Sequence, residues 1–137
     1  MADVKISDLP AASALAGDEP IPVVQSAETR RSTPRAIQRI PVNNQTGTTY
    51  ALVAADAGGC VRANNAAAIA VTAPTGGIFT VGDVILLRQV GAGQVTVTGG
   101  TLNLPATIAA AKTRALGSVI TLHYVATDTW DVSGDLA

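Results

Sequence analysis

The sequence predicts an all-β protein, a small sandwich or jelly-roll-like barrel preceded by an extended N-terminal arm with a short hairpin and helix. From Tyr50 onward, short runs rich in Val, Thr and Ala recur at intervals of about ten residues. Small or turn-forming pairs separate these runs, as at Gly58-Gly59 and Asn64-Asn65. The first forty residues show no such period. We therefore expect an anchoring arm over 1–42 and a β-sandwich domain over 43–137.

The arm divides into three predicted elements. Residues 1–20 are expected to be extended with turns, because prolines and charges interrupt them. Ile21–Gln25 is expected as a strand that pairs with Glu28–Thr33 across a two-residue turn. Ser32-Thr33-Pro34 then predicts a helix start, with a hydroxyl cap and a proline near the first helical position. This helix ends by Pro41, because the residue before a proline avoids the helical region.

The second domain is expected to begin after a polar linker, Asn43–Thr49. Gly99-Gly100 stands between two strand-like runs and predicts a two-residue hairpin turn, since glycine tolerates positive φ at both positions. Thr107–Leu116 has helical propensity but follows Pro105 and lies between strands, so it is expected as loop and strand. The predicted strands are Tyr50–Ala54, Cys60–Ala63, Ala68–Ala73, Val84–Val90, Gln94–Thr98, Thr101–Leu104, Val119–Ala126 and Thr129–Ser133.

Alternation along these strands predicts which side chains face the core, because successive side chains point to opposite faces. Asp83–Val90 is apolar on both faces, so it is expected to be covered on both sides, with one cover supplied by another subunit. The side chains predicted to share a buried face within their strands are Val95 and Val97, then Ile120, Leu122 and Tyr124, and finally Trp130 and Val132.

Composition limits the classes of function. The 47% hydrophobic share includes 25 alanines and only four aromatic residues, so a thin core that leans on self-association is expected. A net charge of −1 argues against a general electrostatic grip on nucleic acid. The single Cys60 excludes an internal disulfide and fits a reducing cytoplasm. The start lacks a secretion signal, and no apolar run approaches the roughly 20 residues that span a bilayer.

The chain offers little for catalysis. One His and one Cys without ligand spacing predict no metal and no cofactor. His123 is expected as a half-exposed strand residue or an interface contact, and Cys60 as a small buried hydrophobe. Asp128 and Asp131 are expected to stabilise turns. The sequence therefore predicts no catalytic, cofactor or metal residues and no enzyme.

One charge cluster lies on the predicted hairpin and helix of the arm. Two interpretations stay open at this point: a solvated arm, or a salt-bridging contact with an acidic partner surface. In the second interpretation the cluster acts with the apolar strand before it. The candidate partner-binding residues are Ile21, Val23, Val24, Arg30, Arg31, Arg35 and Arg39.

Two stretches of the chain resemble known protein modules. The segment KISDLPAASALAGDEPIPVVQSAETRRSTPRAI resembles the short N-terminal module of many bacteriophage tail-fibre, tailspike and related virion proteins. The remainder is similar to a β domain that recurs in phage structural proteins. Its frame comprises Tyr50-Ala51-Leu52, Asp56-Ala57-Gly58, Asn64-Asn65, Val81-Gly82, Gly91 to Val97, Thr127 to Trp130 and Ser133 to Leu136.

The resemblance implies a homotrimeric, all-β virion component, made in the host bacterial cytoplasm, whose arm docks onto the particle. A chain that stops at Ala137 is too short for a long fibre. The expected function is capsid decoration or a short head fibre, with the major capsid protein or a tail or neck protein as partner. A tail-associated adaptor or short tail fibre is the alternative, followed by a receptor- or sugar-binding module. No nucleic-acid or membrane partner is expected.

Overall fold

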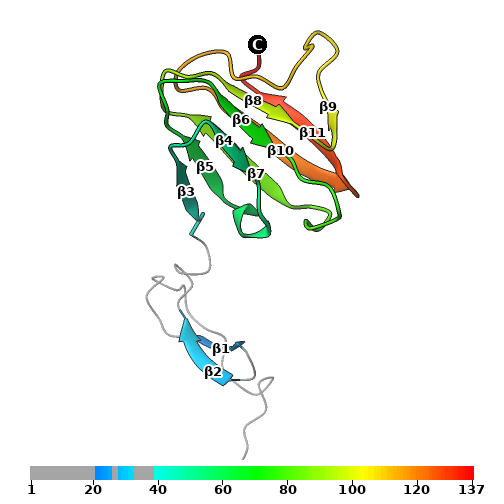
Figure 1. The fold of residues 1–137 in the computed structure, drawn as a ribbon. Coiled ribbons are helices and arrows are strands. Elements are labelled where there is room, and N and C mark those ends of the chain that lie inside the picture. The colour runs from blue at the N-terminus through cyan, green and yellow to red at the C-terminus, as the bar shows by residue number, and fades with distance from the viewer. Residues whose placement is uncertain (1–20, 26–27, 33–38) are drawn as a thin grey trace, which may run out of the picture. The chain divides into compact units, whose positions relative to one another are not determined.

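The computed structural model describes residues 21–25, 28–32 and 39–137 of the chain (Figure 1). The chain divides into two compact units, 1–39 and 40–137, against a predicted boundary after residue 42. Among the described residues, no helix is both long and apolar enough to cross a bilayer.

The first unit contains the predicted hairpin. Strands β1 (Ile21–Gln25) and β2 (Glu28–Ser32) pair antiparallel, with Ile21 opposite Ser32 and Gln25 opposite Glu28. The predicted extended stretch over 1–20 and most of the predicted helix fall outside the described residues.

The second unit is built from two β-sheets, so the all-β, sandwich-like fold predicted from the sequence is confirmed (Figure 1). The six-stranded sheet has the spatial order β3 (Val42–Gln45), β5 (Cys60–Ala63), β7 (Val84–Gln89), β10 (Val119–Ala126), β11 (Thr129–Gly134) and β9 (Thr101–Asn103). The three-stranded sheet has the order β4 (Thr49–Ala51), β6 (Ile69–Thr72) and β8 (Val95–Thr98).

The chain alternates between these two sheets from β3 to β8. Strands β3, β5 and β7 pair parallel in one sheet, and β4, β6 and β8 pair parallel in the other. Each successive pair of strands therefore forms one rung of a short solenoid, with β3 and β4 as the first rung and β7 and β8 as the third. Strands β10 and β11 extend the larger sheet as an antiparallel hairpin.

Within each rung a short turn connects the two strands, and we call this turn the corner of the rung. The corners of successive rungs lie directly against one another. The Asn65 side chain donates a hydrogen bond to the Thr46 carbonyl (2.5 Å) and accepts one from the Ala67 N–H (2.8 Å). In the next rung, the Gly93 N–H donates to the Asn65 carbonyl (2.9 Å). A Cβ at Gly91 or Gly93 would overlap the backbone of Asn65 or Ala67. The corners can stack this closely because these positions are glycine.

The predicted hairpin at Gly99-Gly100 is wrong. Both glycines have positive φ, as a tight turn requires, but the turn carries the chain from one sheet to the other. Strand β8 pairs in parallel with β6, whereas β9 pairs in parallel with β11. The two glycines form the predicted tight turn. The pairing of β8 and β9 was decided by distant strands, because β6 pairs with β8 and β11 pairs with β9.

The predicted linker over Asn43–Thr49 is also wrong, because β3, which begins at Val42, runs through its first three residues and pairs with β5. Its segment VNNQ lacks the apolar alternation that marks the other strands. The inward-facing residues, Asn43 and Gln45, are amides that lie at the open end of the core. A terminal rung is partly solvated, so it does not need the apolar pattern of an interior strand.

The core fills the space between the sheets with one face of each strand. The predicted inward faces of β8, β10 and β11 are confirmed, since all of their predicted residues are buried. Phe79, Tyr124 and Trp130 pack edge-to-face or tilted, with ring centroids 4.8 to 5.9 Å apart. The other buried apolar side chains include Leu52, Val61, Ile69, Val71, Ile85 and Leu87.

Strand β7 is buried on one face only, in contrast to the prediction that Asp83–Val90 is covered on both sides. Ile85 and Leu87 are 0% exposed, whereas Val84 is 37% exposed and Leu86 is half-buried. Within the described part of the chain, nothing covers the outer face of β7. The cover expected from a second subunit stays a prediction.

The segment before β10 follows the prediction of loop and strand. It contains no helix, and isolated bridges join Lys112 to Thr96 and Thr113 to Leu136. The Thr113 N–H donates to the Val95 carbonyl (2.9 Å), and the Val97 N–H donates to the Ala111 carbonyl (2.8 Å). This loop therefore covers the outer edge of β8 and closes the third rung.

One-sided burial of β7 predicts unequal effects for two neighbouring leucines. We expect Leu87→Ala to lower the free energy of unfolding by about 2–5 kcal/mol, because it leaves a cavity in the core. Leu86→Ala should cost about 1 kcal/mol or less, because only part of that side chain is buried. Chemical denaturation of both variants measures the difference. Equal costs would indicate that the outer face of β7 is covered in the assembled protein.

Candidate functional site

A buried carboxylate organises the first rung. Asp56 is 3% exposed and ends the short 3-10 helix η2 (Ala54–Asp56). Its Oδ1 accepts a hydrogen bond from the Asn43 amide (2.8 Å), and its Oδ2 accepts from the Tyr50 hydroxyl (2.8 Å) and the Val53 N–H (2.9 Å). These partners come from β3, from β4 and from the start of η2, so one side chain ties both sheets together.

The network continues through the amides of β3. The Gln45 amide donates to Asn43 Oδ1 (2.7 Å), and the Asn43 amide also donates to the Tyr50 hydroxyl (2.7 Å). Buried or half-buried polar groups are stable when they are hydrogen-bonded to one another. The four side chains therefore close the open end of the core with polar groups that water can reach.

The environment of Tyr50 keeps its hydroxyl protonated. Burial, the hydrogen bond to Asp56 and the charge of Asp56 raise the pKa of Tyr50 to about 12, against an opposing hydrogen bond from Asn43. A phenol with this pKa stays a hydrogen-bond donor at neutral pH. Tyr50 therefore remains a hydrogen-bond donor to Asp56 at neutral pH.

A hollow of about 260 Å³ opens beside this network. Its polar lining residues are Asn43 and Asp56, whose side chains are hydrogen-bonded to each other. Its remaining walls are apolar or backbone and are formed by Pro41, Val42, Val53, Ala55, Gly59 and Cys60. Three of these side chains stand open to solvent, with Val42 at 57% and Val53 at 45% exposed, and Ala55 also exposed. The hollow can receive a small apolar group.

The other candidate groups for chemistry lie apart. Cys60 is half-buried at the hollow, on β5, whereas His123 is exposed on β10, with β7 between the two strands. Over 21–25, 28–32 and 39–137, no group of three or more His, Cys, Asp or Glu side chains could hold a metal ion. The hollow therefore offers shape and apolar contact, and its one carboxylate is already hydrogen-bonded.

Of the two carboxylates predicted to stabilise turns, Asp128 has that role, whereas Asp131 lies within β11 and links this strand to β9. Asp128 accepts hydrogen bonds from the N–H groups of Gly76 and Gly77 (3.0 Å each), and Asp131 accepts from the Asn103 amide (2.8 Å). Each carboxylate joins a loop or strand to a segment distant in the sequence.

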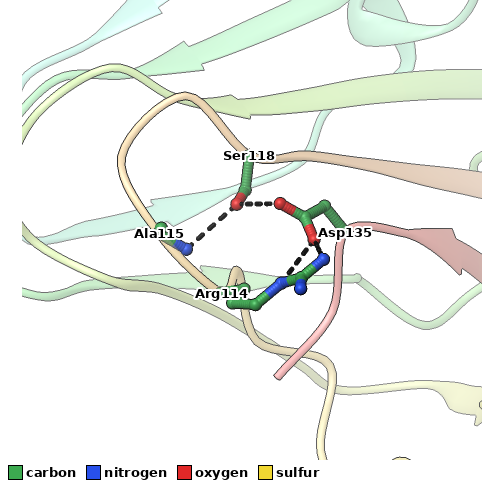
Figure 2. Close-up of polar contacts among 4 residues, drawn as sticks. All are labelled: Arg114, Ala115, Ser118 and Asp135. Carbon is green, nitrogen blue, oxygen red and sulfur yellow. Dashed lines mark hydrogen bonds and ion pairs between the residues drawn. The ribbon is translucent and has the colours of Figure 1, made fainter.

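A second polar cluster fixes the turn before β10 (Figure 2). The Ser118 hydroxyl donates to Asp135 (2.6 Å) and accepts from the Ala115 N–H (3.0 Å). Arg114 pairs with the same carboxylate through its Nε (2.6 Å) and through a second nitrogen. Because Arg114 is largely exposed, this ion pair orients the turn more than it stabilises the fold.

The predicted partner-binding residues lie mostly on the hairpin. Ile21, Val23 and Val24 belong to β1, and Arg30 and Arg31 belong to β2, where Val23 is opposite Arg30 in the register. Arg39 is exposed. Arg35 lies outside the described residues. The register therefore pairs an apolar strand with a strand that carries two arginines, and their joint contact with a partner stays a prediction.

Sequence reasoning missed both the hollow and the fixed turn. Asp56 precedes two glycines and reads as an ordinary turn residue, and its partners Asn43 and Tyr50 were assigned to a linker and to a strand. Ser118 and Asp135 are separated by a whole hairpin.

A scan against family models and searches of curated proteins and of solved structures each found no match. The site must therefore be interpreted from its own residues.

Removing the Tyr50 hydroxyl should change stability in a pH-dependent way. Tyr50 has a pKa raised from 10.0 to about 12 in the folded protein, so below pH 10 its protonated form contributes to stability. Between pH 10 and pH 12 the unfolded chain loses this proton first, and the contribution disappears. We expect the stability of the wild type to fall towards that of Tyr50→Phe across this range, as measured by denaturation at each pH.

The same variant also tests the role of the hydroxyl near neutral pH. Tyr50→Phe deprives the buried Asp56 of one donor, which should cost about 1–3 kcal/mol. Tyr124→Phe is the matched control for alkaline ionisation, because it removes the other tyrosine hydroxyl. If the difference in free energy of unfolding between wild type and Tyr50→Phe stays constant from neutral pH to pH 12, the raised pKa of Tyr50 is contradicted.

Proposed function

We propose that this chain is a non-enzymatic bacteriophage virion structural protein, a capsid decoration or cement protein or a short head fibre. It docks by its N-terminal arm and trimerises through its β domain. The observation that carries this proposal is the division of the chain into an arginine-bearing hairpin unit and a separate β unit. The hairpin unit is suited to binding a partner on the particle, and the β unit is suited to projecting from the particle surface.

The β unit supports an assembly role more than a catalytic one. Its large exposed apolar side chains are spread over both ends of the larger sheet, with Val42 at 57%, Val81 at 65% and Leu116 at 66% exposed. Contiguous apolar surface is typical of sites where subunits meet, whereas single exposed apolar side chains are ordinary. The outer face of β7 adds Val84 and Leu86 to the surface that a neighbouring copy would cover.

The aromatic residues argue against a sugar-binding module. Phe79, Tyr124 and Trp130 are buried, and the Tyr50 hydroxyl is engaged by Asp56. Among the described residues no aromatic ring is left to line an open groove, as stacking on a sugar would require. The proposal of a virion protein therefore stands ahead of the receptor-binding alternative.

Charge reversal on the hairpin tests the docking. We expect the double variant Arg30→Glu and Arg31→Glu to weaken binding to particles that lack the protein by at least about tenfold, because paired charges at an interface are lost. Arg62→Glu with Arg88→Glu is the matched control, since it makes the same charge change on neighbouring strands of the β unit. Cosedimentation with purified particles measures both.

Deletion of residues 1–39 provides the stronger version of the test. The shortened chain should fail to bind particles while its circular dichroism keeps the β signature. Particle binding that survives this deletion would overturn docking through the arm. Binding to isolated tails but not to heads would move the assignment to a tail adaptor or short tail fibre.

A further inference from the structure

Two arginines lie side by side on the outer face of the larger sheet. Arg62 of β5 and Arg88 of β7 are partners in the register of these two parallel strands. The residues before them, Val61 and Leu87, are buried in the core, so the two arginine side chains point away from it. Neighbouring strands lie about 4.8 Å apart. Two positive charges this close repel each other unless an anion lies between them.

The β unit does not supply this anion from its aspartates. In the part of the chain that the structure describes, neither guanidinium group forms an ion pair with a carboxylate. The aspartates of residues 40–137 each accept hydrogen bonds from other groups of the unit, and they are Asp56, Asp83, Asp128, Asp131 and Asp135. The arginine pair is therefore left without a counter-charge from these side chains.

A third polar side chain continues the row. Asn44 of β3 is the partner of Arg62 in the register, so the three side chains lie on three neighbouring strands. The Arg62 Nη1 donates a hydrogen bond to the Asn44 Oδ1 (3.2 Å), which orients the guanidinium group. Among the described residues, the Asn44 amide nitrogen has no acceptor. The row therefore combines two guanidinium groups with an amide donor.

The surroundings of the row are uncharged. Val119 of β10 is the partner of Arg88 in the register, and Cys60 and Leu86 lie two residues before the arginines on β5 and β7. Arg88 is exposed and Arg62 is half-buried, so a ligand can reach both guanidinium groups. An ion pair that is partly shielded by apolar neighbours is screened less by water than a fully exposed one.

The charge of the whole β unit distinguishes between classes of anion. Residues 40–137 contain four Lys or Arg and five Asp side chains. A nucleic acid requires a concentrated positive field, which this unit does not provide. Arginine instead binds a single carboxylate through two parallel hydrogen bonds. An acidic segment of a protein therefore fits the row better than a polymer of phosphates.

We propose that Asn44, Arg62 and Arg88 form a binding site for a carboxylate in an acidic segment of a partner protein. The two guanidinium groups hold the carboxylate oxygens, and the Asn44 amide adds a further donor. This site goes beyond the proposed function, because its residues belong to the β unit and not to the hairpin unit to which docking is assigned.

Binding of a short acidic peptide to the full chain tests the site. The probe is an acetylated and amidated peptide of three glutamates, and its control is the same peptide with three glutamines. A titration followed by nuclear magnetic resonance should show saturable shifts of the backbone amides around Arg62 and Arg88 with the glutamate peptide alone. Observing these amides separates the site from the arginines of the hairpin.

Matched variants assign the binding to the pair. Arg62→Gln with Arg88→Gln should raise the dissociation constant at these amides at least about tenfold, because the charged partners of the carboxylate are lost. Arg30→Gln with Arg31→Gln removes the same charge from the hairpin and should leave this dissociation constant unchanged.

Three results would overturn the site. They are a wild type without saturable shifts at these amides, a glutamine peptide that binds equally well, and an Arg62→Gln with Arg88→Gln protein that binds as tightly as the wild type. A thymidine hexanucleotide that binds at these amides more tightly than the glutamate peptide would also overturn it, because the ligand would then be a phosphate polymer.

Chemical denaturation tests whether the pair serves the fold instead. Arg88→Gln removes one of two like charges, so the denaturation midpoint should stay the same or rise. A lower midpoint would contradict the proposal, because the fold would then depend on the arginine pair.

Particle binding separates this site from the proposed function. A wild type that binds the glutamate peptide at the row but does not bind particles would leave the site intact and remove the virion assignment. A wild type that binds particles but not the peptide would do the reverse.

Discussion

In-register stacking of three parallel rungs is the constraint on which the β unit depends. Val61 lies opposite Leu87 in one sheet and Ile69 lies opposite Val95 in the other. This register places the inward side chains of successive rungs above one another, and the core follows from it. It also forces the corners together, which leaves room only for glycine at residues 91 and 93. A larger residue there would separate the rungs and disturb both sheets.

A stack of parallel rungs must end, and the two ends are closed by different means. At the third rung, the loop around Thr113 bonds along the edge of β8. At the first rung, the amides of β3 and the Asp56 carboxylate replace apolar residues at the end of the core. A buried carboxylate is tolerated there because three donors satisfy it, among them a tyrosine that keeps its proton.

The same two ends carry a hollow and an exposed apolar turn. The hollow beside Asp56 lies at the first-rung end and is lined by residues of η2 and of the starts of β3 and β5. The crossing from the covering loop to β10 needs a tight turn, and that turn exposes Leu116. Both features arise where the stack of rungs ends. The hairpin, with its own register, belongs to a separate unit of the chain.

The sequence by itself determined the all-β class, the positions of most strands and the buried face of β8, β10 and β11. These properties are local, since alternation and turn residues act over a few positions. It also predicted the β1–β2 hairpin, whose partners are close in the chain. Tertiary structure alone decided that β8 and β9 lie in different sheets and that the polar segment at Asn43 is a strand. It also brought Asp56 to Asn43 and Asp135 to Ser118. Each of these outcomes depends on which distant segments make the better hydrogen bonds and packing contacts. A short stretch of sequence cannot predict this, because it contains only one of the partners.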